Sequence, residues 1–307
     1  MIQRLLLLAA LTIVSAHAAT PFHKRVEVVS FIEEMSQRHG FDRDELLGQF
    51  AKVKPSPAVI KAIQPPTNPQ FRSWSAYRAR FVEPIRITRG IAFGKRHSDA
   101  LARAESEFGV PAEIIVAIIG VETIYGRNTG RFHIFNALTN LAFDYPPRAE
   151  LFRRELEELL LLARDQRRSP WSYRGSYAGA LGLPQFLPSS QRHYAVDFDG
   201  DGRVELDRSI EDSIGSVASF LNQHGWQTGE PIMASADDGA QTIPATGSSL
   251  IELATPDGTT EYRLGYNNFF VLTRYNRSSF YASAVADLAL AVKQGMANQS
   301  RASLSTP

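Results

Sequence analysis

The sequence predicts a mainly α-helical protein with a small β insertion, which is an α+β fold. Apolar residues recur at helical spacing through most of the chain after residue 25. The run from Ile114 to Val121 is apolar on every side of a helix, so this helix is expected to be central and buried. Short runs separated by GS and PDG turns in residues 231–270 indicate the β element.

The helical pattern divides the chain into segments. Gly40 separates two expected helices between Arg25 and Val53, and a proline-rich connector follows them. Pro111 marks the start of the central helix, which should end at Gly126. Further helices are expected at 73–93, 98–108, 135–143, 148–164, 214–224 and 281–296. The expected organisation is a signal peptide (1–18), an N-terminal α-helical region (19–105), a core (106–230), a small β region (231–270), a C-terminal helical part (271–297) and a polar tail (298–307).

The N-terminus has the pattern of a secretory signal. One positive charge in MIQR precedes the apolar run LLLLAALTIV, which is too short to span a bilayer. SAHA then supplies the small residues that precede a cleavage site. The chain has no cysteine, so it has neither a disulfide nor a thiol for a lipid anchor. We therefore expect a soluble protein after cleavage.

The composition excludes some classes of function. The chain has 307 residues, of which 44% are hydrophobic and 21% are charged, as in ordinary globular proteins. Its formal net charge of +1 gives no electrostatic footprint for nucleic acid, so no nucleic-acid partner is expected. After the signal, no segment stays apolar over the roughly 18 residues that a membrane span needs.

One carboxylate interrupts the apolar run VAIIGVETIYGRNTG (116–130). Ile115, Ile118 and Glu122 follow the spacing of one helix face. Burial and the C-terminal end of the helix dipole both disfavour the charged form of Glu122, and so raise its pKa. A carboxyl that stays protonated near neutral pH is suited to general-acid cleavage of a glycosidic bond. The alternative is a structural ion pair, for which Arg127 is a candidate.

Two other segments combine polar and aromatic residues. SYAGALGLPQFLPSS (176–190) places Ser176, Gln185 and Phe186 among glycines that allow close backbone approach, and RYNRSSFY (274–281) is similar in character. Such segments can line a groove that hydrogen-bonds to sugar rings and stacks on them. The alternative for each is a packed helix–loop junction. Together with Glu122, the two segments indicate a polar cleft with aromatic walls.

The acidic segment DFDGDGRVELDRSIED (197–212) matches the opening of an EF-hand loop. Asp197, Asp199 and Asp201 occupy positions 1, 3 and 5, and Gly202 occupies the sharp turn at position 6. Arg203, at position 7, would contribute its backbone carbonyl.

The match is incomplete at its end, because position 12 is Arg208 where the standard loop has a bidentate glutamate. A longer loop could close with Asp212. The segment holds seven acidic residues against two arginines, a repulsion that a hard cation would relieve. We favour a structural Ca²⁺ site over a plain acidic surface loop.

Four motifs, in order, resemble the membrane-bound lytic transglycosylase B family of peptidoglycan-cleaving enzymes. They are GVETIYGRNTG, SYAGALGLPQFLPSSQRHYAVDFDGDG, DSIGSVASFLNQHGW and NFFVLTRYNRSSFYASAV, and they extend over roughly residues 110–285. The resemblance implies a lysozyme-like core and Glu122 as the single acid and base. It also implies the substrate-binding residues Ser176, Gln185, Phe186, Tyr275, Asn276, Tyr281, Tyr77 and Arg148.

The resemblance also implies a longer EF-hand-like loop that closes at Asp212, which removes the difficulty at Arg208. Peptidoglycan glycan strands are the implied partner. Other cell-wall enzymes are further candidate partners, and the protein is expected to be a monomer. Two departures from the family matter. Without a lipid-anchor cysteine the chain should be a soluble periplasmic member, and YPPR retains only Arg148 where the family often has paired arginines.

The expected reaction needs only one protein carboxyl. No other acidic residue lies between Ile114 and Phe143, whereas a typical glycosidase uses two carboxylates. The family resemblance accounts for this, because it implies cleavage between N-acetylmuramic acid and N-acetylglucosamine to a 1,6-anhydromuramoyl product, without water. The alternatives are a hydrolytic muramidase and a non-catalytic, calcium-dependent glycan-binding protein.

Overall fold

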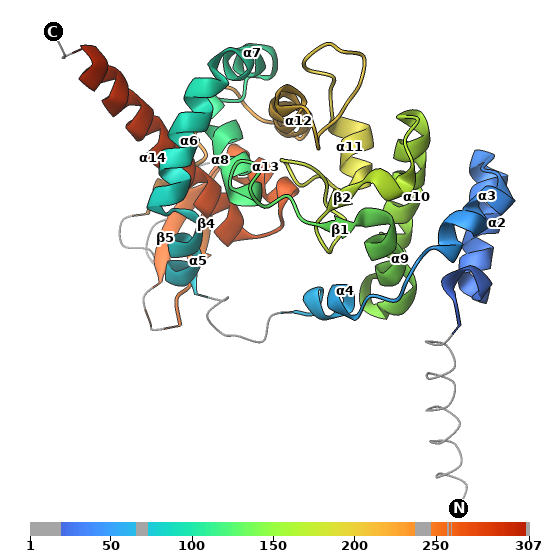
Figure 1. Cartoon of the computed structure of the whole chain (residues 1–307). Helices are drawn as coiled ribbons and strands as arrows, with labels where there is room; N and C mark the ends of the chain where they lie inside the picture. The colour runs from blue at the N-terminus through green and yellow to red at the C-terminus, as the bar shows by residue number, and fades with distance from the viewer. Residues whose placement is uncertain (1–19, 66–72, 237–246, 257, 259, 305–307) are drawn as a thin grey trace, which may run out of the picture. The chain divides into compact units, whose positions relative to one another are not determined.

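The computed structural model describes residues 20–65, 73–236, 247–256, 258 and 260–304 (Figure 1). The expected signal peptide and the run TIPA of the expected β region lie outside these residues. The chain divides into two compact units. Unit 1 comprises Met1–Gln64, Gly130–Ala180 and Leu187–Ser189, and unit 2 comprises Pro65–Thr129, Leu181–Phe186 and Ser190–Pro307. The domain boundaries that the sequence suggests stay a prediction.

Unit 1 is helical apart from one short antiparallel strand pair. Gly40 ends its first long helix in the left-handed conformation (φ 68°), as the sequence predicts, and Asp42 caps the next helix by accepting the Glu45 N–H at 2.7 Å. Phe31 and Phe135 both pack against Phe50, with ring centroids 6.1 and 5.0 Å away. The elements are η1 (Phe22–Lys24), α2 (Val26–His39), α3 (Arg43–Ala51), α4 (Pro57–Ala62), β1 (Phe132–His133), α9 (Ile134–Asp144), η3 (Pro146–Arg148), α10 (Ala149–Asp165), η4 (Pro170–Ser172) and β2 (Arg174–Gly175).

Unit 2 is built around one apolar helix, α8 (Ala112–Thr123). Every residue from Ile114 to Val121 is buried, which confirms the central position that its sequence predicts. Figure 1 shows α6 and α14 running beside α8, and α7 and α12 also pack on it. The other helices that lie in unit 2 are α5 (Trp74–Phe81), α6 (Pro84–Arg96), α7 (Ser98–Phe108), α12 (Ile210–Gln223), α13 (Asn267–Tyr275) and α14 (Ser279–Leu304), while α11 (Pro188–Tyr194) begins in unit 1 and ends in unit 2.

A three-stranded antiparallel sheet forms the β part of unit 2. Its strands are β3 (Met233–Ser235), β4 (Ser249–Leu253) and β5 (Glu261–Gly265), in the order β3-β5-β4. Gly265 pairs with both Met233 and Ser249. A mainly α fold with a small β element is therefore confirmed. Two expected limits differ from the structure: α13 begins at Asn267 within the expected β region, and α14 continues to Leu304 through most of the expected polar tail.

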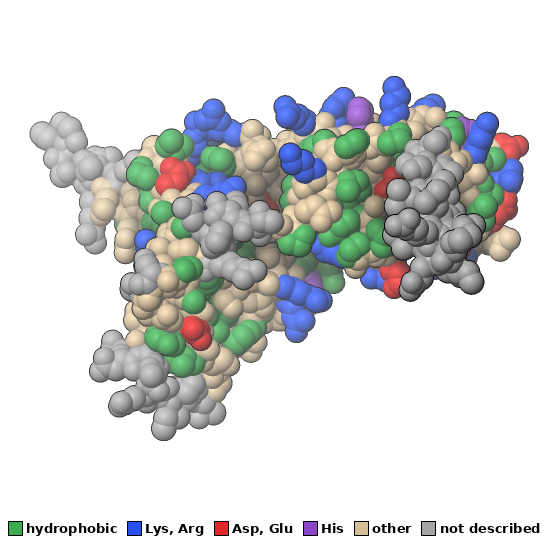
Figure 2. All heavy atoms as spheres, turned by 90° about the horizontal axis from the view of Figure 1, so that it is seen from below, with side chains coloured by type: hydrophobic (Ala, Val, Ile, Leu, Met, Phe, Trp, Pro, Cys, Tyr) green, Lys and Arg blue, Asp and Glu red, His purple; other side chains and the backbone are tan. Residues whose placement is uncertain are grey.

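Charged side chains lie at the surface. On the face that Figure 2 shows, Lys and Arg side chains are prominent, and Asp and Glu side chains are seen at fewer places. Within the described part of the chain, no helix is long and apolar enough to cross a membrane.

Candidate active site

The end of α8 sets the backbone position of Glu122. The helix ends at Thr123, three residues before the Gly126 that the sequence suggests, because Ile124 and Tyr125 both adopt the left-handed conformation (φ 52° and 56°). The Thr123 hydroxyl accepts the Gly126 N–H at 3.1 Å and is 3.1 Å from the Leu183 carbonyl, to which it donates. Two successive non-glycine residues at positive φ are strained, and such strain is typical of functional sites.

The Glu122 carboxyl has a tyrosine partner and no cation partner among the described residues. Tyr281 donates its hydroxyl to Glu122 Oε1 at 2.8 Å. Arg127, the candidate for a structural ion pair, is exposed and makes no ion pair with it. Glu122 keeps some solvent access although protein atoms surround it closely. Burial raises the pKa of Glu122 to about 7, and the Tyr281 hydrogen bond acts in the opposite direction.

Three tyrosines lie around this carboxyl. Tyr281 is 2% exposed and stacks on Tyr275, with ring centroids 6.2 Å apart and planes 13° apart. Tyr275 in turn donates its hydroxyl to the Pro184 carbonyl at 2.6 Å. Burial, and then the charge of Glu122, raise the pKa of Tyr77 to about 12 and those of Tyr275 and Tyr281 well above their usual value. All three hydroxyls therefore stay protonated near neutral pH and can donate.

The LGLPQF segment (181–186) is hydrogen-bonded to the chain that follows α8. The backbone of Gln185 is in the left-handed conformation (φ 53°). Its side-chain NH₂ group donates to the Gly182 carbonyl at 2.8 Å and to the Thr129 carbonyl at 3.2 Å. Phe186 is only 2% exposed and packs 5.7 Å from the Tyr275 ring. Phe186 thus supports a tyrosine of the site instead of presenting a free ring at its surface.

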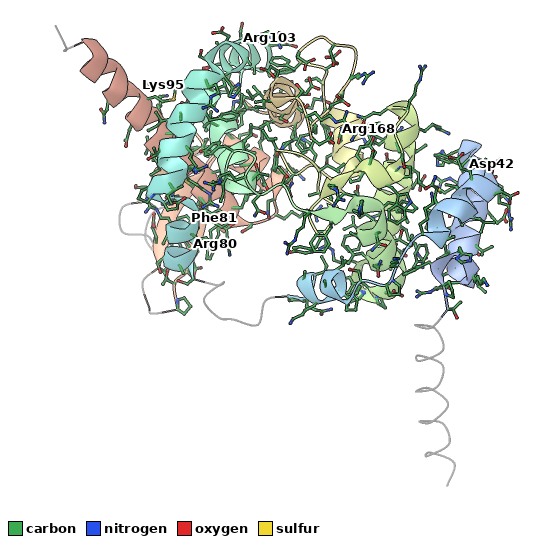
Figure 3. The ribbon with its side chains drawn as sticks, viewed as in Figure 1. Asp42, Arg80, Phe81, Lys95, Arg103 and Arg168 are labelled. Atoms are coloured by element: carbon green, nitrogen blue, oxygen red, sulfur yellow. The ribbon has the colours of Figure 1, made fainter. Side chains whose placement is uncertain are left out.

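The two remaining expected residues of unit 2 lie on a helix and just after another helix. Tyr77 belongs to α5, where its ring is 4.7 Å from that of Phe81 and 5.7 Å from that of Phe280. Figure 3 shows Phe81 and its neighbour Arg80 on this helix. Asn276 is exposed directly after the end of α13.

Ser176 and Arg148 belong to unit 1. The Ser176 hydroxyl oxygen accepts the Ala178 and Ala180 N–H groups at 3.3 and 3.0 Å, so its own proton stays available to a ligand. Arg148 is exposed, with its guanidinium 5.3 Å from the Phe152 ring centroid.

The acidic loop gathers three carboxylates. Asp197, Asp199 and Asp212 each offer an oxygen within 4.8 Å of the others. Asp212 is 1% exposed and accepts three backbone N–H groups, from Phe198 (2.7 Å), Glu205 (2.8 Å) and Asp199 (3.3 Å).

The other residues expected at this loop are arranged differently. Arg208 does not belong to the carboxylate group and instead pairs with Glu205 at 3.3 Å. Asp201 also lies outside the group of three and accepts the Arg203 N–H at 2.8 Å. Arg103, labelled in Figure 3, supports the loop, because its guanidinium donates to the Phe198 carbonyl and covers the Phe198 ring at 3.7 Å.

A match to a known family extends over residues 23–290 and identifies the transglycosylase SLT domain. The chain belongs to this family. Membrane-bound lytic murein transglycosylase B of Escherichia coli (strain K12) is 40% identical over 295 residues, which cover 85% of this chain and 81% of the relative.

Solved structures of the SLT family have the same fold. Soluble lytic transglycosylase SltB1 from Pseudomonas aeruginosa is 45% identical with a TM-score of 0.81, covering 88% of this chain and 99% of that one. The E. coli lytic transglycosylase Slt35 in complex with calcium is 38% identical with a TM-score of 0.79, covering 87% and 93%. SltB3 from P. aeruginosa in complex with NAG-anhNAM-pentapeptide is 28% identical with a TM-score of 0.75, covering 87% and 79%. The lysozyme-like fold that the sequence predicts is thereby confirmed.

Two residues that hold the C-terminal end of α8 could not be identified from the sequence pattern. Arg86 is buried on α6 and donates from Nε to the Gly120 carbonyl of α8 at 3.0 Å. The Tyr125 hydroxyl occupies the space beside Gly90 and Gly120, where an added Cβ would lie 2.4 Å from it. The sequence does contain a signal for this contact, because Gly90 and Gly120 each lie inside a helix, and a glycine inside a helix often indicates close packing.

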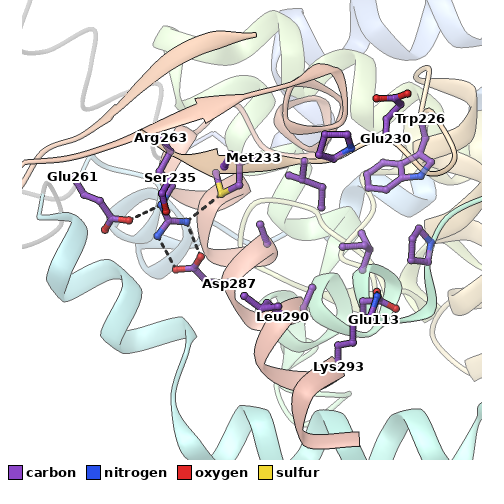
Figure 4. Close-up of a pocket in the computed structure, with 17 residues that line it drawn as sticks. Glu113, Trp226, Glu230, Met233, Ser235, Glu261, Arg263, Asp287, Leu290 and Lys293 are labelled. Carbon is purple, nitrogen blue, oxygen red and sulfur yellow. Dashed lines mark hydrogen bonds and ion pairs between the residues drawn. The ribbon is translucent and has the colours of Figure 1, made fainter. Parts of the chain in front are cut away.

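A separate pocket of about 560 Å³ lies between α14, β3 and the start of α8 (Figure 4). Its charged residues are largely paired with one another. Arg263 binds Asp287 through two contacts of 2.6 and 3.0 Å, and Lys293 binds Glu113 at 2.7 Å. These pairs leave the pocket little free charge with which to bind an ionic ligand.

Proposed function

We propose that Glu122 is the single acid and base with which this lytic murein transglycosylase cleaves peptidoglycan glycan strands. The bond is the β-1,4 linkage from N-acetylmuramic acid to N-acetylglucosamine, and the product carries a 1,6-anhydromuramoyl end. The observation that carries the proposal is a carboxyl with a pKa raised to about 7 and no ion-pair partner in the described residues. The SltB3 complex with NAG-anhNAM-pentapeptide supports the anhydro product.

The reaction has two proton transfers at one residue. Protonated Glu122 gives its proton to the glycosidic oxygen, and the bond from C1 to that oxygen breaks as positive charge develops at C1. The N-acetyl oxygen of the substrate stabilises this charge. Ionised Glu122 then accepts the proton of the C6 hydroxyl, which attacks C1 and closes the anhydro ring. Water is not consumed, and the residue needs a pKa near neutrality because it acts in both directions.

The surrounding residues bind and orient the substrate. Tyr281 holds the Glu122 carboxyl through its hydrogen bond and stabilises the ionised form. Tyr77, Tyr275 and Asn276 bind the sugar rings, with Gln185 and Phe186 supporting them, and Ser176 and Arg148 act as further contacts. Ser176 has a free hydroxyl proton with which to orient the N-acetyl group.

Digestion of purified sacculi followed by mass analysis of the products tests the proposal. The wild-type protein should release anhydro-muropeptides, and Glu122→Gln should release none while keeping the fold. Products heavier by one water would instead identify a hydrolytic muramidase. Binding to sacculi without any product would identify a glycan-binding protein, and release of anhydro-muropeptides by Glu122→Gln would exclude Glu122 as the acid.

The acidic loop would hold a structural Ca²⁺ ion. Asp197, Asp199 and Asp212 supply hard oxygen ligands, and Gly200 and Gly202 at φ 79° and 87° give the loop its sharp turns. The calcium complex of Slt35 supports this assignment. Asp201 and the Arg203 carbonyl complete the ligand set that we propose. The ion would stabilise the loop before α12 and would take no part in the reaction.

A periplasmic location fits this substrate. Residues 1–18 would direct export and be removed, and the absence of a cysteine excludes a thiol-linked lipid anchor. We propose that the protein acts there as a soluble monomer, with other cell-wall enzymes as candidate partners.

A further inference from the structure

Unit 1 contains a pocket of about 440 Å³ that the proposed reaction does not use. We call it the basic pocket. It lies where the end of α3 meets β1, the start of α9 and the η4 turn. Its lining residues are Lys52, Lys54, Arg131, Phe132, His133, Asn136 and Trp171. Three of these carry a positive charge and none carries a carboxylate.

The charges of the basic pocket are not neutralised by the protein. Lys52, Lys54 and Arg131 are exposed and make no ion pair with an acid in the described chain. Arg174 adds a fourth cation at the edge, because it donates to the Arg131 carbonyl at 3.1 Å. The pocket beside α14 is the opposite case, since its cations are paired with acids. Like charges that lie close together repel one another, and an anion would relieve that repulsion.

The uncharged polar groups of the pocket are also donors. Asn136 uses its side-chain oxygen to accept the Lys54 N–H at 2.8 Å, which leaves its NH₂ group to donate. The indole N–H of Trp171 is buried and has no acceptor among the described residues. A buried donor without an acceptor costs free energy, and a ligand oxygen would remove that cost.

His133 has its tautomer set by its neighbours. Arg174 Nη2 lies 3.1 Å from His133 Nε2, and His133 Nδ1 lies 3.0 Å from the Trp171 carbonyl. Because a guanidinium can only donate, Nε2 accepts and Nδ1–H donates to the carbonyl. The two contacts hold the imidazole 5.8 Å from the Trp171 ring, so the pocket has an ordered aromatic side beside its cations.

We propose that the basic pocket binds a carboxylate ligand, and that on the substrate this ligand is the peptide stem of the glycan strand. The clustered cations, the free Asn136 amide and the unused Trp171 N–H match carboxylate oxygens, and the aromatic side accommodates small aliphatic side chains. The identity of the ligand rests on the proposed function, whereas the preference for an oxyanion rests on the pocket alone. The pocket would make the enzyme favour strands that carry peptides.

Direct binding tests the pocket without any catalysis. Calorimetric titration of the full mature chain with the free stem pentapeptide should give a saturable curve, and the same peptide with its carboxylates amidated should bind at least about tenfold more weakly. The double variant Lys52→Gln with Lys54→Gln should lose a similar factor. The matched double variant Lys24→Gln with Lys61→Gln removes the same charge from exposed positions of unit 1 outside the pocket, and should bind like the wild type.

A second variant covers the case in which the lysine variant fails to fold. Trp171→Phe keeps an aromatic ring and removes the unused donor, so it should bind the pentapeptide more weakly while still unfolding in one cooperative thermal transition. Equal binding of the amidated peptide, or wild-type affinity in both pocket variants, would overturn the proposal. Tighter binding of inorganic phosphate than of the pentapeptide would also overturn it and would identify a phosphate site.

Substrate preference separates this proposal from the proposed function. Wild-type enzyme should cleave peptide-bearing strands at a lower KM than strands stripped of their peptides, and the Lys52/Lys54 double variant should lose this difference while still cleaving the stripped strands. If the wild type cleaves neither substrate, the proposed function fails and the titration still decides the pocket. If the double variant keeps the preference, the stem does not bind there.

Discussion

Replacing Glu122 by glutamine should stabilise the protein at alkaline pH and leave its stability unchanged at acidic pH. Burial raises the pKa of Glu122 from 4.5 to about 7. Below the pKa of the unfolded chain, Glu122 is protonated in both the folded and the unfolded state and costs nothing. As the pH rises from the unfolded-state pKa to the folded-state pKa, the unfolded chain ionises while the buried carboxyl resists ionisation, so the wild type loses stability. Above the folded-state pKa the loss is complete, because folding must then hold an ionised carboxylate in a site that disfavours it.

The magnitude follows from the difference between these two pKa values. At 1.36 kcal/mol for each pKa unit the full cost is about 3 kcal/mol, and the partial solvent access of Glu122 reduces the expected value to about 2 kcal/mol. In a unit of this size, about 2 kcal/mol corresponds to a rise of about 4–8 °C in Tm. Glu122→Gln should therefore melt several degrees above the wild type at pH 8, with no difference near pH 4.

Calorimetric melting of both proteins between these pH values is the assay. Glu113→Gln provides a matched control, because Glu113 lies at the start of the same helix and removal of its charge breaks an ion pair with Lys293. This variant should gain no stability at pH 8. A constant difference between wild type and Glu122→Gln across the pH range, or an equal gain in the control, would show that the raised pKa of Glu122 does not cause the change in stability.

Three further outcomes are expected. Tyr281→Phe removes the hydrogen bond that holds down the pKa of Glu122, so the alkaline limb of the kcat/KM profile should move up by about one pH unit; an unmoved limb would contradict this. Gly90→Ala should lower the free energy of unfolding by about 1–3 kcal/mol, because the added Cβ would lie 2.4 Å from a tyrosine hydroxyl. Gly48→Ala, whose Cβ would meet nothing within 4 Å, should raise the free energy of unfolding by about 0.5–1 kcal/mol. Equal effects of the two variants in thermal unfolding would count against the close packing at Gly90. Calcium should raise the Tm of the wild type, and Asp197→Ala should remove most of that increment; a full increment in the variant would place the ion elsewhere.

The helical core could be predicted because its signal is local. Eight successive apolar residues from Ile114 to Val121 leave a helix no polar face, and burial follows directly. The end of that helix could not be predicted in the same way. Gly126 is the usual residue for a helix end, but the chain leaves the helix earlier, at the left-handed residues Ile124 and Tyr125, and the Thr123 hydroxyl beside them bonds to a segment sixty residues away. Sequence spacing carries no information about such a contact.

In the candidate site, too, features set by local sequence could be predicted and features set by distant contacts could not. Glu122 could be singled out because an acid in an apolar helix has a cost that the sequence alone reveals. Whether Arg127 neutralised it depended on the direction of the chain after Thr123, which two left-handed residues determine. The burial of Phe186 and the contact from Arg86 to α8 depend on elements far away in the sequence, so neither could be derived from local pattern.

The lack of a cationic partner for Glu122 in the described structure has a consequence for inhibitors. In the proposed reaction, positive charge develops at the sugar carbon C1. A ligand that carries a positive charge at the position of C1 would form an ion pair with Glu122, which has no cationic partner in the described structure. Its affinity should rise with pH until Glu122 is fully ionised, above its pKa of about 7, and a neutral ligand of the same shape should show no such trend. The carboxyl that weakens the folded enzyme in alkaline solution is thus also the group that would select a cationic inhibitor there.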